Sequence, residues 1–116
     1  MSGRITPARF RRIALGMKDA TEGAHHDHPD FRVGGKIFAS LHPDNNAGMV
    51  KLTPEQQKGF VRDLPDAFAP ENGAWGRAGC TAVRLAAVDE ESLGEAMTLA
   101  WRNATTKPPA RTKRRG

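Results

Sequence analysis

Four histidines and their neighbouring carboxylates are the side chains best suited to metal binding or proton transfer. They form a run of His25, His26, Asp27, His28 and Asp30, with His42 further along the chain. On an extended segment alternate side chains point the same way, so His26 and His28 would share a face. Zinc or iron needs three or four converging ligands, which this run lacks without His42 or a folded carboxylate. A metal site at His25, His26, His28 and His42 stays open, with hydrogen-bonded surface histidines as the favoured interpretation.

Nucleophilic and phosphate-binding motifs are weak in this chain. The single cysteine, Cys80, excludes an internal disulfide and has no recognisable catalytic motif around it, so we expect an inert thiol. Gly73, Gly76 and Gly79 are evenly spaced but lack the Lys-Ser/Thr ending of a phosphate-binding loop. They predict a flexible turn before a strand. We therefore expect a protein that is not an enzyme and has no catalytic residue and no cofactor.

A scattered set of cations, together with one tryptophan, could bind a polyanion. Cations contact phosphates and an aromatic ring stacks on bases, which are the contacts that nucleic-acid binding uses. The candidate contacts are Arg32, Lys36, Lys51, Trp75, Arg77 and Arg84. The alternative is that these cations only form the solvent-exposed face of a sheet and bind no partner.

The net charge is concentrated at the C-terminus. The formal net charge is +5, yet residues 1–106 carry 13 Lys and Arg against 13 Asp and Glu. The whole excess lies in Lys107, Arg111, Lys113, Arg114 and Arg115. We expect one neutral domain over residues 1–106 and a disordered basic tail over residues 107–116. Such a tail attracts polyanions without selecting among them.

A glycine pair predicts the hairpin that would carry two of these cations. Gly34-Gly35 separates two runs, 30–33 and 36–41, that are predicted as strands, which favours a type I′ turn. A two-residue turn would pair Val33 with Lys36 and Phe31 with Phe38. The resulting faces would be Phe31, Val33 and Phe38 on one side, and Arg32, Ile37, Ala39 and Leu41 on the other. Both faces are partly apolar, so the pattern leaves the core side open.

The remaining elements follow from caps, breakers and periodicity. Helices are predicted over residues 7–17, 54–64 and 90–104, beginning after Thr6, Thr53 and Asp89. Further strands are predicted over 48–52 and 81–88, and residues 65–79 contain enough Pro and Gly to predict a long loop. Hairpin-length links require antiparallel pairing. The expected fold class is α+β, a two-layer sandwich with helices from both ends of the chain on one sheet face.

Composition limits the broader classes. Hydrophobic residues make up 38% and charged residues 27%, and no apolar run is long enough for a membrane span or a signal peptide. We therefore expect a cytoplasmic protein with no membrane association, and a monomer.

Three segments together resemble the MmcQ/YjbR family. They are HHDHPDFRVGGKIFA at 25–39, MVKLTPEQQ at 49–57 and WGRAGCT at 75–81, and the resemblance runs from Phe10 to Asn103. It implies a bacterial protein with a fold similar to CyaY, the bacterial frataxin, in which terminal helices pack on a twisted antiparallel sheet. Members are commonly described as predicted DNA-binding proteins, with no catalytic residues or cofactor. The family match points to the Lys36 hairpin and the Trp75–Arg77 loop as contacts.

Three functions therefore compete. The first is nucleic-acid binding of low sequence specificity through the hairpin, the Trp75 loop and the tail. The second is a non-enzymatic adaptor whose Trp75 and loop 65–79 anchor a protein partner. The third is a metal or small-ligand site at His25–His28.

Overall fold

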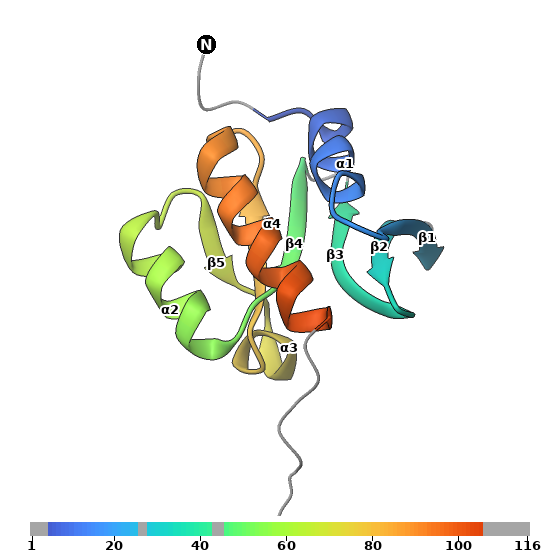
Figure 1. Cartoon of the computed structure of the whole chain (residues 1–116). Coiled ribbons are helices and arrows are strands. Elements are labelled where there is room, and N and C mark those ends of the chain that lie inside the picture. Colours follow the sequence, from blue (N-terminus) through green and yellow to red (C-terminus); the bar gives the residue numbers. More distant parts are fainter. Residues whose placement is uncertain (1–4, 26–27, 43–45, 106–116) are drawn as a thin grey trace, which may run out of the picture.

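The computed structural model describes residues 5–25, 28–42 and 46–105, and shows an α+β protein built on one antiparallel sheet (Figure 1). The elements are α1 (Pro7–Leu15), β1 (Thr21–His25), β2 (His28–Val33), β3 (Lys36–His42), β4 (Ala47–Lys51), α2 (Pro54–Asp63), β5 (Phe68–Pro70), α3 (Gly73–Arg77), β6 (Cys80–Arg84) and α4 (Glu90–Thr105). The sheet has six strands in the order β1-β2-β3-β4-β6-β5. The basic tail lies outside the described residues.

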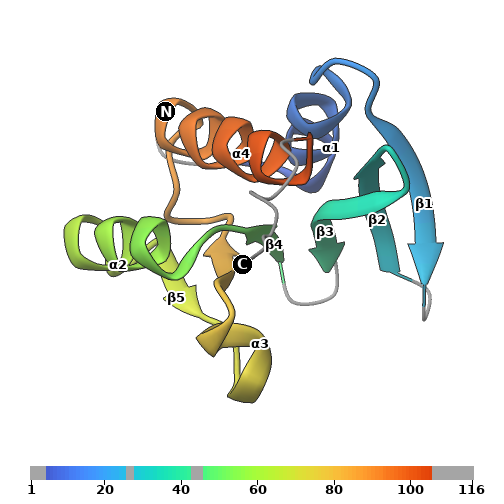
Figure 2. The same cartoon turned by 60° about the horizontal axis from the view of Figure 1, so that its bottom comes forward.

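The helices leave one face of the sheet largely open. α1 and α4 lie against the same face, whereas α3 lies beyond the opposite face (Figure 2). α2 packs beside β5, where the rings of Phe60 and Phe68 have centroids 4.9 Å apart. This arrangement confirms the predicted two-layer sandwich with helices from both ends of the chain on one face. No helix within the described ranges is long and apolar enough to cross a membrane.

The predicted starts of the three long helices are confirmed by their caps. The Thr6 hydroxyl accepts a hydrogen bond from a backbone N–H of the first turn of α1. Thr53 and Gln56 form a reciprocal capping box at α2, with distances of 3.1 and 2.9 Å. At α4 the carboxylate of Asp89 accepts from the backbone N–H of Ser92 at 2.7 Å. These side chains satisfy N–H groups that the helices cannot pair internally.

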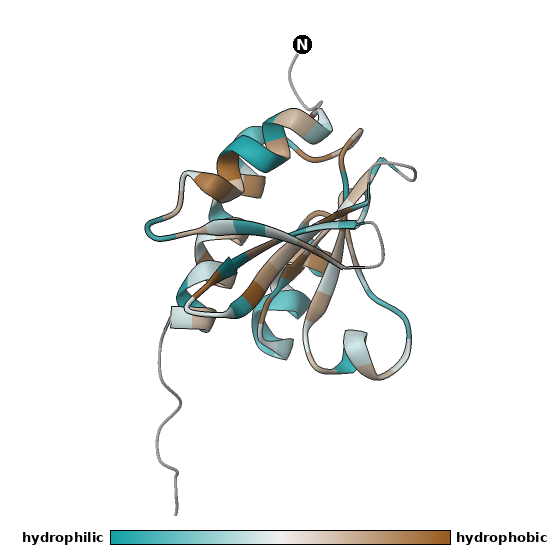
Figure 3. Ribbon diagram, turned by 90° about the vertical axis from the view of Figure 1, so that its right-hand side faces the viewer, coloured by the Kyte–Doolittle hydropathy of each residue, from teal (hydrophilic) through white to brown (hydrophobic). Residues whose placement is uncertain are grey.

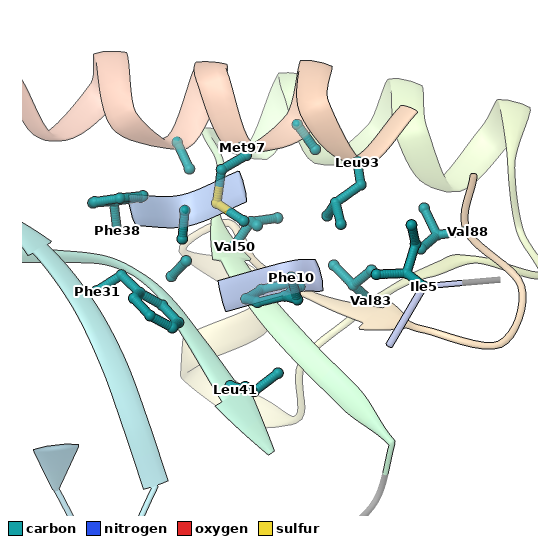
Figure 4. Packing of buried hydrophobic residues seen from close by; sticks show 14 of the residues in the cluster. Ile5, Phe10, Phe31, Phe38, Leu41, Val50, Val83, Val88, Leu93 and Met97 are labelled. Atoms are coloured by element: carbon teal, nitrogen blue, oxygen red, sulfur yellow. The ribbon is translucent and has the colours of Figure 1, made fainter. Parts of the chain in front are cut away.

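The core lies between α1, α4 and the covered face of the sheet. α1 contains both hydrophilic and hydrophobic stretches (Figure 3), and its Phe10 and Ala14 are fully buried. Leu93 and Met97 descend from α4 toward Val50 and its neighbours (Figure 4). Gly48 of β4 makes room for Phe10, because a Cβ at this glycine would lie 2.5 Å from the ring. The terminal helix can therefore approach the middle of the sheet closely.

The hairpin forms as predicted at its turn but not along its strands. Gly34 and Gly35 both have positive φ, and Val33 pairs with Lys36. Phe31, however, pairs with Ala39, because the register shifts between Phe31 and Arg32. The predicted pairing of Phe31 with Phe38 is therefore wrong. Phe38 is the extra residue of a β-bulge.

This bulge decides which residues of the hairpin face the core. Phe38 and Ala39 are both buried, although strict alternation would place them on opposite faces. The covered face receives Phe31, Val33, Phe38, Ala39 and Leu41, and the open face receives Arg32, Ile37, Ser40 and His42. The prediction that placed Ala39 and Leu41 with Arg32 and Ile37 is corrected by this one-residue shift.

Two segments without a predicted element contain regular structure. Residues 65–79, predicted as a loop, include β5 and α3. The evenly spaced glycines are therefore not a flexible turn, since Gly73 and Gly76 belong to α3. The polar segment 21–25 forms β1 at the edge of the sheet. The strand predicted over 81–88 is β6, which ends at Arg84.

The glycines before β6 give a stability test of this packing. Gly79 has φ +112°, and a Cβ there would lie 1.9 Å from the carbonyl oxygen of Leu52. We expect Gly79→Ala to lower the free energy of unfolding by about 3 kcal/mol, because strain and overlap add. Gly59→Ala is the control: it has open space in α2 and should raise stability by about 0.5 kcal/mol. Urea unfolding followed by circular dichroism measures both, and equal effects would contradict this account.

Candidate binding pocket on the open face of the sheet

A pocket of about 340 Å³ lies on the open face of the sheet, beside α3. Three strands, α3 and the segment before it supply the lining: Ile37, Ser40 and His42 of β3, Met49 and Lys51 of β4, Cys80 of β6, Trp75 of α3, and Glu71 and Asn72 before α3. Its volume falls within the range typical of small-molecule sites. Apolar side chains and a few polar groups converge there, as in most binding pockets.

The strand register builds the floor of this pocket. Ser40 pairs with Met49, and Lys51 pairs with Cys80, so these side chains lie in adjacent rows of one face. The bulge in β3 brings Ile37 to the same face. Next to Met49 the strands carry only small residues, Ala82 and Ala69. Because these side chains are small, they project little from the open face and leave space next to the pocket.

Buried hydrogen bonds hold α3 against the strands. The side-chain amide of Gln57 in α2 donates to the carbonyl oxygens of Gly76 and Cys80, both at 3.0 Å, and reaches Thr81 Oγ1 at 3.2 Å. Gly76 is needed for this approach, since a Cβ would lie 1.8 Å from the carbonyl oxygen of Glu71. The position of α3 is therefore tied to both α2 and β6.

Trp75 lies on this short helix and remains open to solvent. Its side chain is 68% exposed, and it is the large hydrophobic residue exposed within the described part of the chain. Burial of so large an apolar surface is normally favourable. A tryptophan held at the rim of a pocket is therefore available to a binding partner.

Three ionisable groups meet inside the pocket. Burial raises the pKa of the Cys80 thiol, the nearby ammonium of Lys51 lowers it, and the carboxylate of Glu71 raises it again. Burial also raises the pKa of Glu71. The raised pKa leaves the Cys80 thiol with less of the reactive thiolate form.

The remaining candidate cations do not all join this pocket. Arg32 lies on the open face, but its guanidinium contacts the fully buried carboxylate of Asp30 at 2.7 Å. Lys36 pairs with the core residue Val33, so the register assigns Lys36 to the covered face of the sheet, opposite the pocket. Arg77 is exposed on α3.

Arg84 lies at the other end of the open face. It lines a separate hollow of about 180 Å³, together with Ala47 and Ala82. The register puts it four residues from Cys80 along β6. The structure thus brings Lys51 and Trp75 together and leaves Arg84 at a distance.

The histidine cluster is only partly described. The rings of His28 and His42 have centroids 4.6 Å apart, and His42 Nε2 lies 3.1 Å from the hydroxyl of Ser40. His26 and the side chain of His25 lie outside the described residues. Among the residues that the structure describes, no three metal-ligating side chains gather at one point.

Sequence reasoning missed most of the pocket lining. Ser40, Met49, Glu71 and Asn72 carry no motif, and no local signal could have found them. Ile37 was correctly grouped with Arg32, but without a function and without a choice between the covered and the open face. These residues become neighbours only through the strand register and the position of α3.

Removal of the Gln57 amide tests how α3 is held. We expect Gln57→Leu to lower the free energy of unfolding by about 2 kcal/mol, because the carbonyl oxygens of Gly76 and Cys80 would each lose a buried side-chain donor and keep only one backbone N–H donor. Lys58→Leu, on the exposed side of the same helix, is the control and should change stability by less than about 0.5 kcal/mol. Hydrogen exchange of residues 73–80 should become faster only in Gln57→Leu. Unchanged exchange there would contradict this role.

Alkylation of Cys80 tests the electrostatics of the pocket. A higher pKa leaves less thiolate at a given pH, so the folded protein should react more slowly with iodoacetamide than the unfolded chain. Glu71→Gln should increase the rate at pH 8, and Lys51→Met should decrease it. In urea all three proteins should react alike. The opposite order of the folded variants would refute this description.

Comparisons with known proteins agree with the fold. The sequence pattern of the YjbR family matches residues 15–103. The crystal structure of Deinococcus radiodurans protein DR2400, a DUF419-domain protein, superposes with a TM-score of 0.78 at 19% identity, covering 95% of this chain and 86% of that chain. That similarity shows a common fold. No curated protein matches the chain. Because the family match includes most of the sequence, the chain belongs to the YjbR family.

Proposed function

We propose that this protein is a non-enzymatic nucleic-acid-binding protein of low sequence specificity that uses the open face of its sheet. The observation that supports this most is Trp75, 68% exposed beside a pocket that also contains Lys51. Aromatic rings stack on bases of any sequence, and cations contact the phosphates that join them. A tryptophan and a lysine at one pocket combine both contacts.

Two cations of this face suit a strand that runs across it. Lys51 pairs with Cys80 and Arg84 pairs with Ala47, so the two cations are separated by four residues along β4 and β6. At about 3.3 Å per residue this separation is about 13 Å, or about four stacked nucleotides. Neither cation has an ion-pair partner within 4.0 Å among the described residues. Arg32 contributes less, since Asp30 neutralises it.

The last described residues, which precede the basic C-terminal segment in the sequence, lie close to Lys51. Asn103, close to the end of α4, donates a hydrogen bond to the backbone oxygen of Lys51 at 3.1 Å. Lys107 and four further cations follow within ten residues of the end of the described chain. Their charge would add to the attraction of a polyanion, which is long-ranged and independent of sequence.

Salt dependence and substitution test this proposal. We expect a fluorescent oligonucleotide to bind in low salt, with an affinity that falls as salt rises because bound counterions are released. Trp75→Ala should weaken binding about tenfold through loss of base stacking. Lys51→Ala and Arg84→Ala should each reduce the salt slope by about 0.7 for single strands. Removal of residues 107–116 should reduce the salt slope more than any single substitution does.

The control is Lys58→Ala, which removes a cation from the helical side and should leave the affinity within about twofold of the original protein. Trp75→Phe should retain most of the binding, because a smaller aromatic ring still stacks. Flat titrations with both DNA and RNA at low salt would overturn the proposed function. Equal losses in Lys58→Ala and Lys51→Ala would show that binding does not use the open face.

A further inference from the structure

We infer that the pocket beside Trp75 receives one unstacked nucleobase, so that the bound nucleic acid is single-stranded and a free mononucleotide enters the same pocket. This inference rests on the proposed function and names the ligand of its central site. The pocket volume of about 340 Å³ is near the lower end for small-molecule sites. Such a space is large enough for one nucleoside-sized group.

The lining matches the two kinds of surface that a base presents. A nucleobase has flat apolar faces and a polar edge. Trp75, Ile37 and Met49 provide apolar contact for the faces. Ser40 and Asn72 provide hydroxyl and amide groups, which can both donate and accept at the edge. Neither an apolar ligand nor a bare phosphate would use both sets of groups.

The charged groups of the pocket have different partners on a nucleotide. Lys51 can contact the phosphate, as lysines commonly do. The carboxylate of Glu71 repels phosphate but accepts hydrogen bonds from an exocyclic amino group, as acidic side chains do from cytosine. Glu71 therefore favours adenine, cytosine or guanine over uracil or thymine, whose matching position is a carbonyl oxygen. An anion site alone would not include this carboxylate.

Base pairing limits which nucleic acids can fill the pocket. In a duplex the bases are stacked and paired, and their faces are inaccessible to a tryptophan on the protein surface. A single strand can turn one base outward at lower cost. The pocket therefore selects single strands over duplexes, and its one base preference is the discrimination by Glu71 against uracil and thymine.

Cys80 gives a direct report of pocket occupancy. It is the single cysteine of the chain and lines the pocket, so a bound base would shield its thiol from alkylation. We expect AMP, at ten times its dissociation constant, to slow iodoacetamide modification about tenfold, because about one molecule in ten remains unoccupied. UMP should protect at higher concentration than AMP. Ribose 5-phosphate, which carries the anion without the base, should not protect.

Variants distinguish protection of Cys80 by a bound base from protection that does not depend on the pocket. Trp75→Ala should lose protection by AMP, whereas Lys58→Ala should keep it. Glu71→Gln should reduce the difference between AMP and UMP, because a carboxamide can donate as well as accept. A labelled single strand should bind about tenfold more tightly than the corresponding duplex, which cannot offer a base for stacking.

The outcomes distinguish this inference from the proposed function. Equal protection by ribose 5-phosphate and AMP would overturn the base pocket, as would oligonucleotide binding without any protection by a mononucleotide. The second result would leave the proposed function intact. Protection by AMP without oligonucleotide binding would support a nucleotide pocket and overturn the proposed function. Absence of both would overturn the two together.

Discussion

The position of one short helix depends on a single buried amide. Gln57 belongs to α2, yet its side chain donates to backbone groups at the end of α3 and the start of β6. Thr81 continues this network by donating to the carbonyl oxygen of Gly79 at 2.8 Å. Buried polar groups are costly unless they are paired, so this network permits few arrangements of α3. The exposed Trp75 and the pocket wall follow from it.

The open face of the sheet is the second half of the site. α1, α2 and α4 occupy the other side, so the open face is left with a row of small residues and a few polar ones. Lys51 and Glu71 then share a partly buried pocket, where Coulomb interactions are stronger than in water. A carboxylate and an ammonium in one pocket suit a ligand with both donor and acceptor groups. A purely anionic ligand would meet repulsion from Glu71.

Family membership and fold do not by themselves identify a ligand. The similarity to protein DR2400 extends over 95% of this chain but at 19% identity, and one fold supports many functions. The proposed function therefore depends on Trp75, Lys51 and Glu71, three side chains with distinct chemistry that line one pocket. The net charge of the chain is a weaker guide, because its excess lies in the last ten residues. Charge of that kind attracts polyanions without positioning them.

Local signals in the sequence determined the caps at Thr6 and Thr53, the Gly34-Gly35 turn, the three long helices and the α+β class, because each depends on residues close together in the chain. Lys51 and Trp75 could also be identified as candidates by residue type alone. The bulge at Phe38, the edge strand β1, the short helix α3 and the pocket itself were decided by tertiary structure. The bulge appears only in the pairing of Phe31 with Ala39 across the hairpin, β1 exists only as the edge strand beside β2, and α3 depends on Gln57, which is 19 residues away from Gly76. A polar edge strand or a glycine-rich helix has little propensity of its own, and forms because packing and hydrogen bonds from other elements outweigh that preference.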